Sequence, residues 1–234
     1  MEKNLVMKFP KSTIFESLAN KIGQDYHDAI STKGYFSIIL SGGSSPKALY
    51  HLLPDTIKDW SNVYLFLGDE RSVPMTHDDS NQKMINDTLI SNIEIPRENI
   101  FFPDTMKPLD QSFKEYDKLL SNFLKEKGKI DTTLLGLGDD AHTLSLFPHT
   151  KALSDKSLYT QNYVAKLSSW RLTGTYELLN NSENIYFLVI GKNKENAINA
   201  IFGKECDHQS YPAQRILDEY PNSSWYIEDI IKID

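Results

Sequence analysis

Short apolar runs typical of buried strands alternate with helical patterns along nearly the whole chain. The runs that favour strands lie at residues 4–9, 35–40, 63–67, 132–137, 185–190 and 225–227. The segments that favour helices lie at residues 46–53, 82–90, 113–124, 194–202 and 213–217. No linker or repeat interrupts the alternation, so we expect one domain over residues 1–234. The pattern predicts an α/β fold with a mostly parallel sheet and helices on both faces.

A further helix is predicted between the first two of these strands. Apolar side chains recur there at every fourth residue: Ile14, Leu18, Ile22, Tyr26 and Ile30. Such spacing lines one face of a helix. Thr13 and Glu16 have the spacing of a capping box, so we expect Thr13 to cap the start of this helix.

The net charge of the chain indicates which classes of binding partner to expect. The chain has 25 Lys and Arg against 32 Asp and Glu, a formal charge of −7. Proteins that bind nucleic acids normally present a positive field, because neutralising phosphates supplies most of their affinity. The balance therefore argues against a nucleic-acid partner. A small anion can still bind where a few basic groups gather locally.

Cysteine content and apolar run lengths bear on the compartment. The single cysteine, Cys206, cannot form an internal disulfide. It has no Cys-x-x-Cys partner, so we interpret it as a small apolar side chain that packs inside. The N-terminal apolar run is too short for a signal peptide, and no run approaches the roughly 18 residues of a membrane helix. We expect a soluble cytoplasmic protein without a membrane partner.

Three loops that follow predicted strands carry candidate chemistry, and ligands of parallel sheets bind at this edge. The first loop reads Ser41-Gly42-Gly43-Ser44-Ser45-Pro46. Glycine N–H groups, serine hydroxyls and a helix start can together bind a phosphate. The Gly-Lys-Ser/Thr ending of a nucleotide P-loop is missing, which argues against ATP or GTP hydrolysis. An ordinary Gly-Ser turn is the alternative.

The second loop, predicted over residues 68–75, begins with Gly68-Asp69-Glu70-Arg71. Two carboxylates and a guanidinium at the end of a strand can form either a functional site or a salt-bridged turn. These residues alone do not separate the two interpretations.

The third loop reads Gly136-Leu137-Gly138-Asp139-Asp140-Ala141-His142-Thr143. It satisfies G-x-G-x-x-A, but Asp139 and Asp140 would repel a pyrophosphate, so we interpret the dinucleotide fingerprint as accidental. A carboxylate near a histidine is instead typical of proton transfer. His142 is the one histidine of six that combines a strand-end loop, glycines and a nearby acid. His27, His51, His77 and His208 are interpreted as surface residues, and His77-Asp78-Asp79 as a solvated acidic loop rather than a metal site.

Taken in order, these motifs resemble those of the 6-phosphogluconolactonases, within the wider family that includes the glucosamine-6-phosphate deaminases. The first loop matches Ser-Gly-Gly-Ser-Thr-Pro, and residues 68–74 match Gly-Asp-Glu-Arg-x-Val-Pro. The segment from Leu134 to Pro148 matches the most specific motif of the family. Further matches are Ser80-Asn81, Arg171-Leu172-Thr173, Gly191 with Lys194, Pro212-Ala213 and Trp225-Tyr226. The resemblance implies a Rossmann-like fold of the NagB/RpiA/CoA-transferase-like class.

The resemblance also implies hydrolysis of 6-phospho-D-glucono-1,5-lactone to 6-phosphogluconate, in the oxidative pentose phosphate pathway. His142 would be the general base, and Asp140 would orient it. Asp69 would line the sugar pocket. The phosphate would be bound by Ser41, Gly42, Gly43, Ser44, Arg71, Arg171 and Lys194. No metal or organic cofactor is implied. Oligomeric state is left open.

Three positions depart from the pattern of the family. Ala141 stands where a glycine is usual, so a positive φ there would strain the loop. Glu195 follows Lys194 where alanine is frequent, and its charge would weaken phosphate binding. Ser169 stands near Arg171 where proline is common.

Alternative functions remain open beside lactone hydrolysis. A glucosamine-6-phosphate deaminase shares the fold and the acid-x-His pattern, but the run over residues 142–148 lacks the glutamate of its ring-opening motif. A phosphosugar sensor without catalysis is suggested by Ala141. An NAD-dependent oxidoreductase would rest only on the accidental fingerprint.

Overall fold

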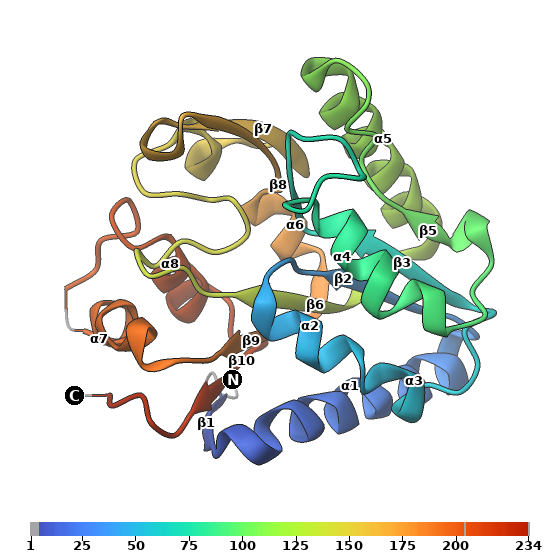
Figure 1. Cartoon of the computed structure of the whole chain (residues 1–234), viewed down its shortest axis with the longest axis horizontal. Helices are drawn as coiled ribbons and strands as arrows, with labels where there is room; N and C mark the ends of the chain where they lie inside the picture. Colours follow the sequence, from blue (N-terminus) through green and yellow to red (C-terminus); the bar gives the residue numbers. More distant parts are fainter. Residues whose placement is uncertain (1–4, 204, 234) are drawn as a thin grey trace.

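A seven-stranded parallel sheet forms the centre of the computed structural model, which describes residues 5–203 and 205–233 (Figure 1). Its spatial order is β1 (Leu5–Phe9), β10 (Ser223–Glu228), β9 (Ser182–Val189), β6 (Ile130–Gly136), β2 (Phe36–Leu40), β3 (Val63–Leu67) and β5 (Ile100–Phe101). All of its strand pairs are parallel. The predicted parallel sheet is confirmed. Asn4, predicted to begin the first strand, lies outside the described residues.

Helices cover both faces of this sheet, as predicted. One face is covered by α1 (Lys11–Lys33), α2 (Ser44–Tyr50), α3 (Leu53–Thr56) and α4 (Asn81–Thr88). The other is covered by α5 (Leu109–Lys127), α6 (Tyr176–Asn180), α7 (Glu195–Phe202) and α8 (Pro212–Glu219). Alternate strand residues supply the two cores, because successive side chains point to opposite faces. Ile38 packs with the first set of helices, whereas Ile39 packs with α5.

Short 3-10 helices connect these elements. They are η1 (Ile90–Asn92), η2 (Arg97–Asn99), η3 (Lys151–Ser154), η4 (Ala165–Leu167) and η5 (Lys192–Lys194). No helix within residues 5–203 and 205–233 is both long enough and apolar enough to cross a membrane.

The predicted capping box at the start of α1 is wrong. The helix begins at Lys11 after Pro10, and Thr13 lies inside its first turn. The Pro10 carbonyl accepts the N–H groups of Thr13 and Ile14 at 3.0 and 3.1 Å, and also the Thr13 hydroxyl. Proline has no N–H and a φ compatible with a helix start, so the chain enters the helix three residues earlier than a Thr13 cap would place it.

A second, three-stranded antiparallel sheet was not predicted. It pairs β4 (Asp69–Arg71) with β8 (Ser169–Gly174), and β8 with β7 (Tyr159–Val164). Residues 69–71 are therefore a strand, not the loop expected after β3. The hairpin of β7 and β8 lies above the carboxyl edge of the main sheet (Figure 1). This small sheet positions the second candidate loop against the third.

Candidate active site

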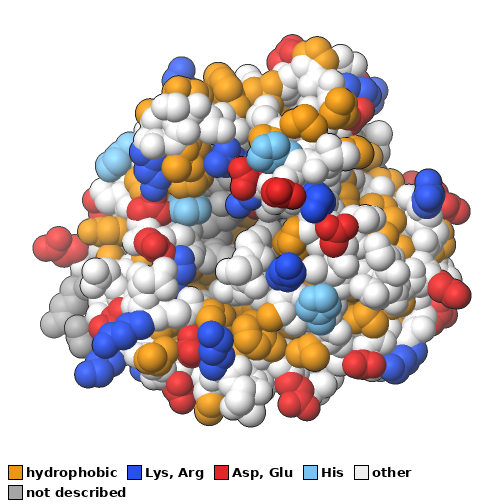
Figure 2. Space-filling view, viewed as in Figure 1, with side chains coloured by type: hydrophobic (Ala, Val, Ile, Leu, Met, Phe, Trp, Pro, Cys, Tyr) orange, Lys and Arg blue, Asp and Glu red, His pale blue; other side chains and the backbone are white. Residues whose placement is uncertain are grey.

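A cavity of about 540 Å³ lies at the carboxyl edge of the main sheet. Its charged and aromatic lining comes from segments that are far apart in the sequence: Asp69, Arg71, Asp139, Asp140, His142, Phe147, Lys166, Arg171 and Lys194. An adjoining cavity of about 220 Å³ is lined by the 41–43 loop, Asn81 and again His142. Figure 2 shows a hollow near the centre of this face, with basic, acidic and histidine side chains around it. Every candidate site residue except Ser44 lines one of these two cavities.

His142 is held between a carboxylate and an aromatic ring. Its Nδ1 is in hydrogen-bond contact with Asp140 Oδ1, and its ring stacks on Phe147 with centroids 3.9 Å apart. Gly138 lies directly against the imidazole, where an added Cβ would come within 2.0 Å of Nδ1. Only glycine leaves room for the ring in this position.

Burial lowers the pKa of His142 to about 4, and the nearby Asp69 carboxylate offsets this only in part. The imidazole is therefore neutral near pH 7. Because a carboxylate accepts from Nδ1–H, the neutral ring carries its proton on Nδ1 and leaves the Nε2 lone pair available. A neutral imidazole of this kind can act as a general base.

Lys166, which is not among the site residues predicted from the sequence, joins the β7–β8 hairpin to the Asp140–His142 pair. Its Nζ contacts Asp140 Oδ2, on the carboxylate oxygen that His142 leaves free. The same ammonium lies 4.8 Å from the centroid of Phe147, so that ring is covered by His142 and Lys166. A lysine in a polar hairpin gives no sequence signal, because only the folded hairpin brings it near Asp140.

Arg71 and Arg171 stand directly opposite each other in the register of β4 and β8. Arg171 Nη1 donates to Ser169 Oγ at 2.7 Å, and Arg71 Nη1 donates to the Asp79 carbonyl. Burial, and then the charge of Arg71, lower the pKa of Arg171. Like charges opposite each other on a sheet destabilise it unless an anion lies between them. The pair therefore favours an anionic ligand.

Lys194 also lines both cavities, but its Nζ is bound to Asp139 Oδ1, which also accepts from Asn193 Nδ2 at 2.9 Å. This hydrogen bond from Lys194 lowers the pKa of Asp139. An anion that takes up Lys194 must compete with this carboxylate. The charge of Glu195 is expected to weaken phosphate binding. In the structure its carboxylate accepts the backbone N–H of Lys232 at 3.0 Å.

The two acids of the second loop have different surroundings. Asp69 is buried, lines both cavities and accepts the Ser145 hydroxyl at 2.6 Å through Oδ2. Glu70 is fully buried and accepts from Ser80, Asn81, Gln82 and the Arg71 N–H. Neither of the two interpretations, a functional site or a salt-bridged turn, therefore describes both acids. Asp69 faces the cavity, whereas Glu70 binds the residues at the start of α4.

The 41–43 loop is held from two sides. The Tyr50 hydroxyl donates to the Ser41 carbonyl at 2.6 Å and accepts the Ser41 N–H at 2.9 Å. The backbone of Ser41 is therefore satisfied internally. Asn81 packs against Gly42, where a Cβ would come within 2.0 Å of its Oδ1. Gly43, with φ of 102°, leads into α2, whose first N–H groups have no intrahelical partners.

Comparison with known proteins identifies the family. The family model described as "Glucosamine-6-phosphate isomerases/6-phosphogluconolactonase" matches residues 10–225. The chain belongs to this family. It is 40% identical over 195 residues to the 6-phosphogluconolactonase of Synechocystis, with 80% of each chain covered. It is 31% identical over 232 residues to that of Chlamydia pneumoniae, covering 97% of this chain and 88% of the relative.

Solved structures of the family have the same fold. The crystal structure of the 6-phosphogluconolactonase of Thermotoga maritima has a TM-score of 0.85 at 25% identity, covering 97% of this chain and 100% of that one. A monomeric glucosamine-6-phosphate deaminase of the NagB superfamily has a TM-score of 0.80 at 19% identity, covering 97% of this chain and 98% of that one. This last likeness concerns the fold alone.

Ala141, the departure from the family pattern next to His142, does take a strained backbone. Its φ is 60°, in the left-handed region, and its side chain is fully buried. The Ala141 N–H donates to the Gly138 carbonyl, and its own carbonyl accepts the Ala213 N–H at 3.0 Å. These contacts impose the conformation that a family glycine would adopt without cost.

Two other features of this family member lie outside the site. Cys206 is exposed, so the interpretation as a packed apolar side chain is wrong. Desolvation and the nearby Asp218 raise the pKa of its thiol.

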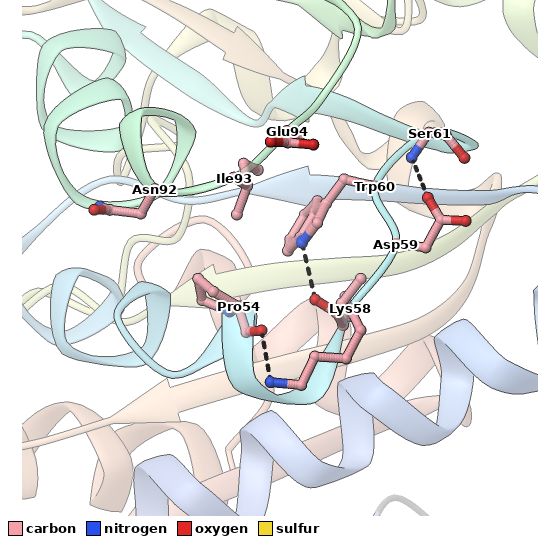
Figure 3. Close-up of a pocket in the computed structure, with 9 residues that line it drawn as sticks. Pro54, Lys58, Asp59, Trp60, Ser61, Asn92, Ile93 and Glu94 are labelled. Atoms are coloured by element: carbon pink, nitrogen blue, oxygen red, sulfur yellow. Dashed lines mark hydrogen bonds between the residues drawn. The ribbon is translucent and has the colours of Figure 1, made fainter.

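A cavity of about 310 Å³ near α3 is lined by Pro54, Trp60 and Glu94 among others (Figure 3). The hydrogen bonds drawn there join near neighbours in the chain, such as Trp60 Nε1 to the Ile57 carbonyl at 2.9 Å, and none involves a histidine.

Proposed function

We propose that this protein hydrolyses 6-phospho-D-glucono-1,5-lactone to 6-phosphogluconate, with His142 as the general base. One arrangement carries the proposal: a neutral imidazole held by Asp140 shares a cavity with Arg71 and Arg171, which pair across β4 and β8. The imidazole supplies a proton acceptor, and the two arginines supply a site for an anion. The relatives named as 6-phosphogluconolactonases support the same reaction.

The proposed reaction uses water and the imidazole. His142 Nε2 takes a proton from water as the water oxygen attacks the lactone carbonyl carbon, and a tetrahedral intermediate forms. The bond from that carbon to the ring oxygen then breaks, and the imidazolium returns its proton to the departing oxygen. Asp140 stabilises the imidazolium between these steps. The product acid loses one proton to solvent and becomes a carboxylate.

In this proposal the phosphate is bound by the basic groups of the cavity. Arg71 and Arg171 hold it with charge-assisted hydrogen bonds, and Lys194 exchanges Asp139 for a phosphate oxygen. The N–H groups of Gly42 and Gly43 contribute from the adjoining cavity, and that of Ser44 follows them at the start of α2. The Ser41 backbone is held by Tyr50, so its hydroxyl is the group left for binding. Asp69 lines the sugar-binding part.

A direct lactonase assay tests the proposal. Glucose-6-phosphate dehydrogenase would generate the lactone freshly, and acid release would be followed above the spontaneous rate. We expect His142→Ala to lower kcat by roughly 10²–10⁴ fold while binding of 6-phosphogluconate is nearly unchanged. His27→Ala, on the exposed side of α1, serves as the matched control. Unchanged turnover of His142→Ala would remove the proposed base.

The phosphate assignment has its own variant. We expect Arg171→Ala mainly to raise KM, because it removes binding shared by ground state and transition state. Arg97→Ala, an exposed arginine of η2, is the control. A defect confined to kcat in Arg171→Ala would contradict the assignment.

The same assay separates the alternatives. A deaminase would release ammonia from glucosamine 6-phosphate and leave the lactone unaccelerated, whereas a sensor would bind 6-phosphogluconate without turnover of either substrate. We further propose a single domain over residues 1–234 that acts in the cytoplasm on this small molecule without a nucleic-acid partner. The absence of any internal disulfide and the charge of −7 support these last two points.

A further inference from the structure

A cluster of metal-ligating side chains lies away from the active site, in the connection between α7 and α8. Cys206 and His208 belong to this connection, and Asp218 lies near the end of α8. Cys206 Sγ is 3.2 Å from His208 Nε2, which is 2.8 Å from Asp218 Oδ2, and Sγ is 3.8 Å from that oxygen. Within the described part of the chain, no other group of three such side chains meets at one point.

The geometry distinguishes a ligand set from a catalytic relay. In a relay the thiol faces one imidazole nitrogen and the carboxylate faces the other. Here the sulfur and the carboxylate oxygen both face Nε2 of His208. The three donor atoms therefore converge on one point instead of forming a line. We propose that Cys206, His208 and Asp218 bind a divalent cation of the zinc type.

The separations between the donor atoms suit that cation. Zinc bonds of about 2.3 Å to sulfur and about 2.0–2.1 Å to nitrogen and oxygen place tetrahedral ligands about 3.3–3.6 Å apart. The observed separations of 2.8–3.8 Å bracket these values, so shifts of about half an ångström complete the site. A mixed thiolate, imidazole and carboxylate set favours Zn²⁺ or Co²⁺ over Mg²⁺ and Ca²⁺, which prefer oxygen ligands.

Groups around the donors hold them in place. Glu219 Oε1 lies 3.9 Å from Nδ1 of His208, which is longer than a hydrogen bond, and Glu219 Oε2 accepts the Arg215 Nε–H at 2.8 Å. The buried Gln214 amide donates to the Ala200, Ile201 and Glu205 carbonyls, at 3.4, 3.2 and 2.9 Å. Its Oε1 accepts the Asp207 N–H at 2.8 Å, between the two ligands in sequence. The connection is therefore fixed to α8 before a cation binds.

Binding of the cation displaces the thiol proton to solvent and leaves a sulfur–metal bond. The fourth position would be taken by water, as in sites with three protein ligands. The cation would tie the 205–211 segment to α8. That segment also accepts the His149 N–H through the Gln209 carbonyl, and Ala213 donates to Ala141. A cation at this site would thus stabilise the segment that packs behind the His142 loop.

Titration of the full-length protein with Co²⁺ tests the proposal, because thiolate ligation produces a near-ultraviolet charge-transfer band. The chain has one cysteine, so the band reports Cys206 alone. We expect a saturable 1:1 band that is absent in Cys206→Ser. His208→Gln and Asp218→Asn should weaken Co²⁺ binding at least ten-fold, whereas His27→Gln should leave it unchanged.

Zn²⁺ should displace Co²⁺ and abolish the band, and it should raise the melting temperature of the wild type but not of Cys206→Ser. Absence of the band at millimolar Co²⁺ would overturn the proposal. A band that persists at full affinity in both His208→Gln and Asp218→Asn would also overturn it, because the thiol alone would then bind the metal. Cation binding that is lost in His142→Ala and kept in Cys206→Ser would assign the metal to the active site instead.

Discussion

The imidazole of His142 combines two properties that oppose each other in water: it contacts a carboxylate and yet stays neutral. The nearby charge of Asp69 favours the charged ring, whereas burial under Phe147 and beside Gly138 disfavours it. Desolvation is the larger effect, and the pKa falls to about 4. The imidazole can thus accept a proton across the whole neutral range.

This balance predicts how the histidine titrates. In the NMR spectrum of the free protein, the His142 ring signals, assigned by their loss in His142→Gln, should titrate with a midpoint near pH 4. The unfolded chain protonates this ring near pH 6.5, so stability falls as the pH drops from about 6.5 to 4, by roughly 3 kcal/mol at most. His142→Gln should lack this loss. A midpoint near 6.5 would contradict the dominance of burial.

Ala141, next to His142, carries backbone strain. A left-handed conformation costs a residue with a Cβ roughly 1–2 kcal/mol, and this φ is 60°. Two hydrogen bonds keep this conformation in place: the Ala141 N–H donates to the Gly138 carbonyl, and the Ala141 carbonyl accepts the Ala213 N–H. Glycine would adopt it without that cost.

We therefore expect Ala141→Gly to stabilise the protein, by roughly 0.5–1 kcal/mol after the greater entropy of glycine in the unfolded chain is subtracted. Ala197→Gly is the matched control: it removes the same methyl group from a buried position in helix α7 and should destabilise by about 1 kcal/mol. Urea denaturation measures both. Equal losses of stability in the two variants would show that Ala141 bears no strain.

At the scale of elements, Glu70 connects β4 to the start of α4. One carboxylate oxygen accepts the Arg71 and Asn81 N–H groups, and the other accepts the Gln82 N–H and the Ser80 hydroxyl. Burial raises the pKa of Glu70, although these backbone donors oppose the shift. The link keeps Asn81 against Gly42, and so orders the adjoining cavity.

Glu70→Gln tests this connection. An amide replaces one acceptor oxygen with a donor, so two buried donors lose their partner, and we expect a loss of roughly 2–3 kcal/mol in stability. Glu98→Gln, at an exposed position in η2, should change stability by less than about 0.5 kcal/mol. Chemical denaturation of both variants decides the point; a Glu70→Gln loss as small as that of the control would exclude the structural role.

For the whole molecule, a charge of −7 surrounds a cavity that gathers Arg71, Arg171 and Lys194. Two effects on an anionic substrate therefore compete. The acidic surface repels it at long range, and the basic groups attract it at short range. Salt screens charges separated by more than about 8–10 Å, and weakens exposed contacts as well.

If the basic cluster dominates binding, the KM for the lactone should rise several-fold between low and physiological ionic strength. Arg171→Ala should flatten this dependence, whereas Arg97→Ala should keep it. Steady-state kinetics over a salt series measures all three. A KM that falls with salt would show that long-range repulsion by the acidic surface is the larger effect.

Much of the central fold was predictable because it depends on local periodicity. Apolar side chains at every fourth residue of α1 reflect the burial of one helix face. The apolar runs of β2, β3 and β9 reflect the burial of both faces of the sheet. The start of α1 was not predictable from the spacing of Thr13 and Glu16. The Pro10 carbonyl, and not the Thr13 side chain, accepts the N–H groups of the first turn. The β7–β8 hairpin was missed because its residues are mostly polar and their pairing with β4 is long-range.

The sequence by itself determined that this chain forms a parallel α/β sheet with polar loops at its carboxyl edge, and that Asp140 and His142 stand two residues apart in one of them. Only the tertiary structure decided that Arg71 faces Arg171, that Lys166 reaches Asp140, that Glu70 is buried away from the cavity, and that Cys206 meets His208 and Asp218. The physical reason is range. Periodicity and motifs record contacts between near neighbours in the chain, whereas charges brought together by strand register depend on the closed fold.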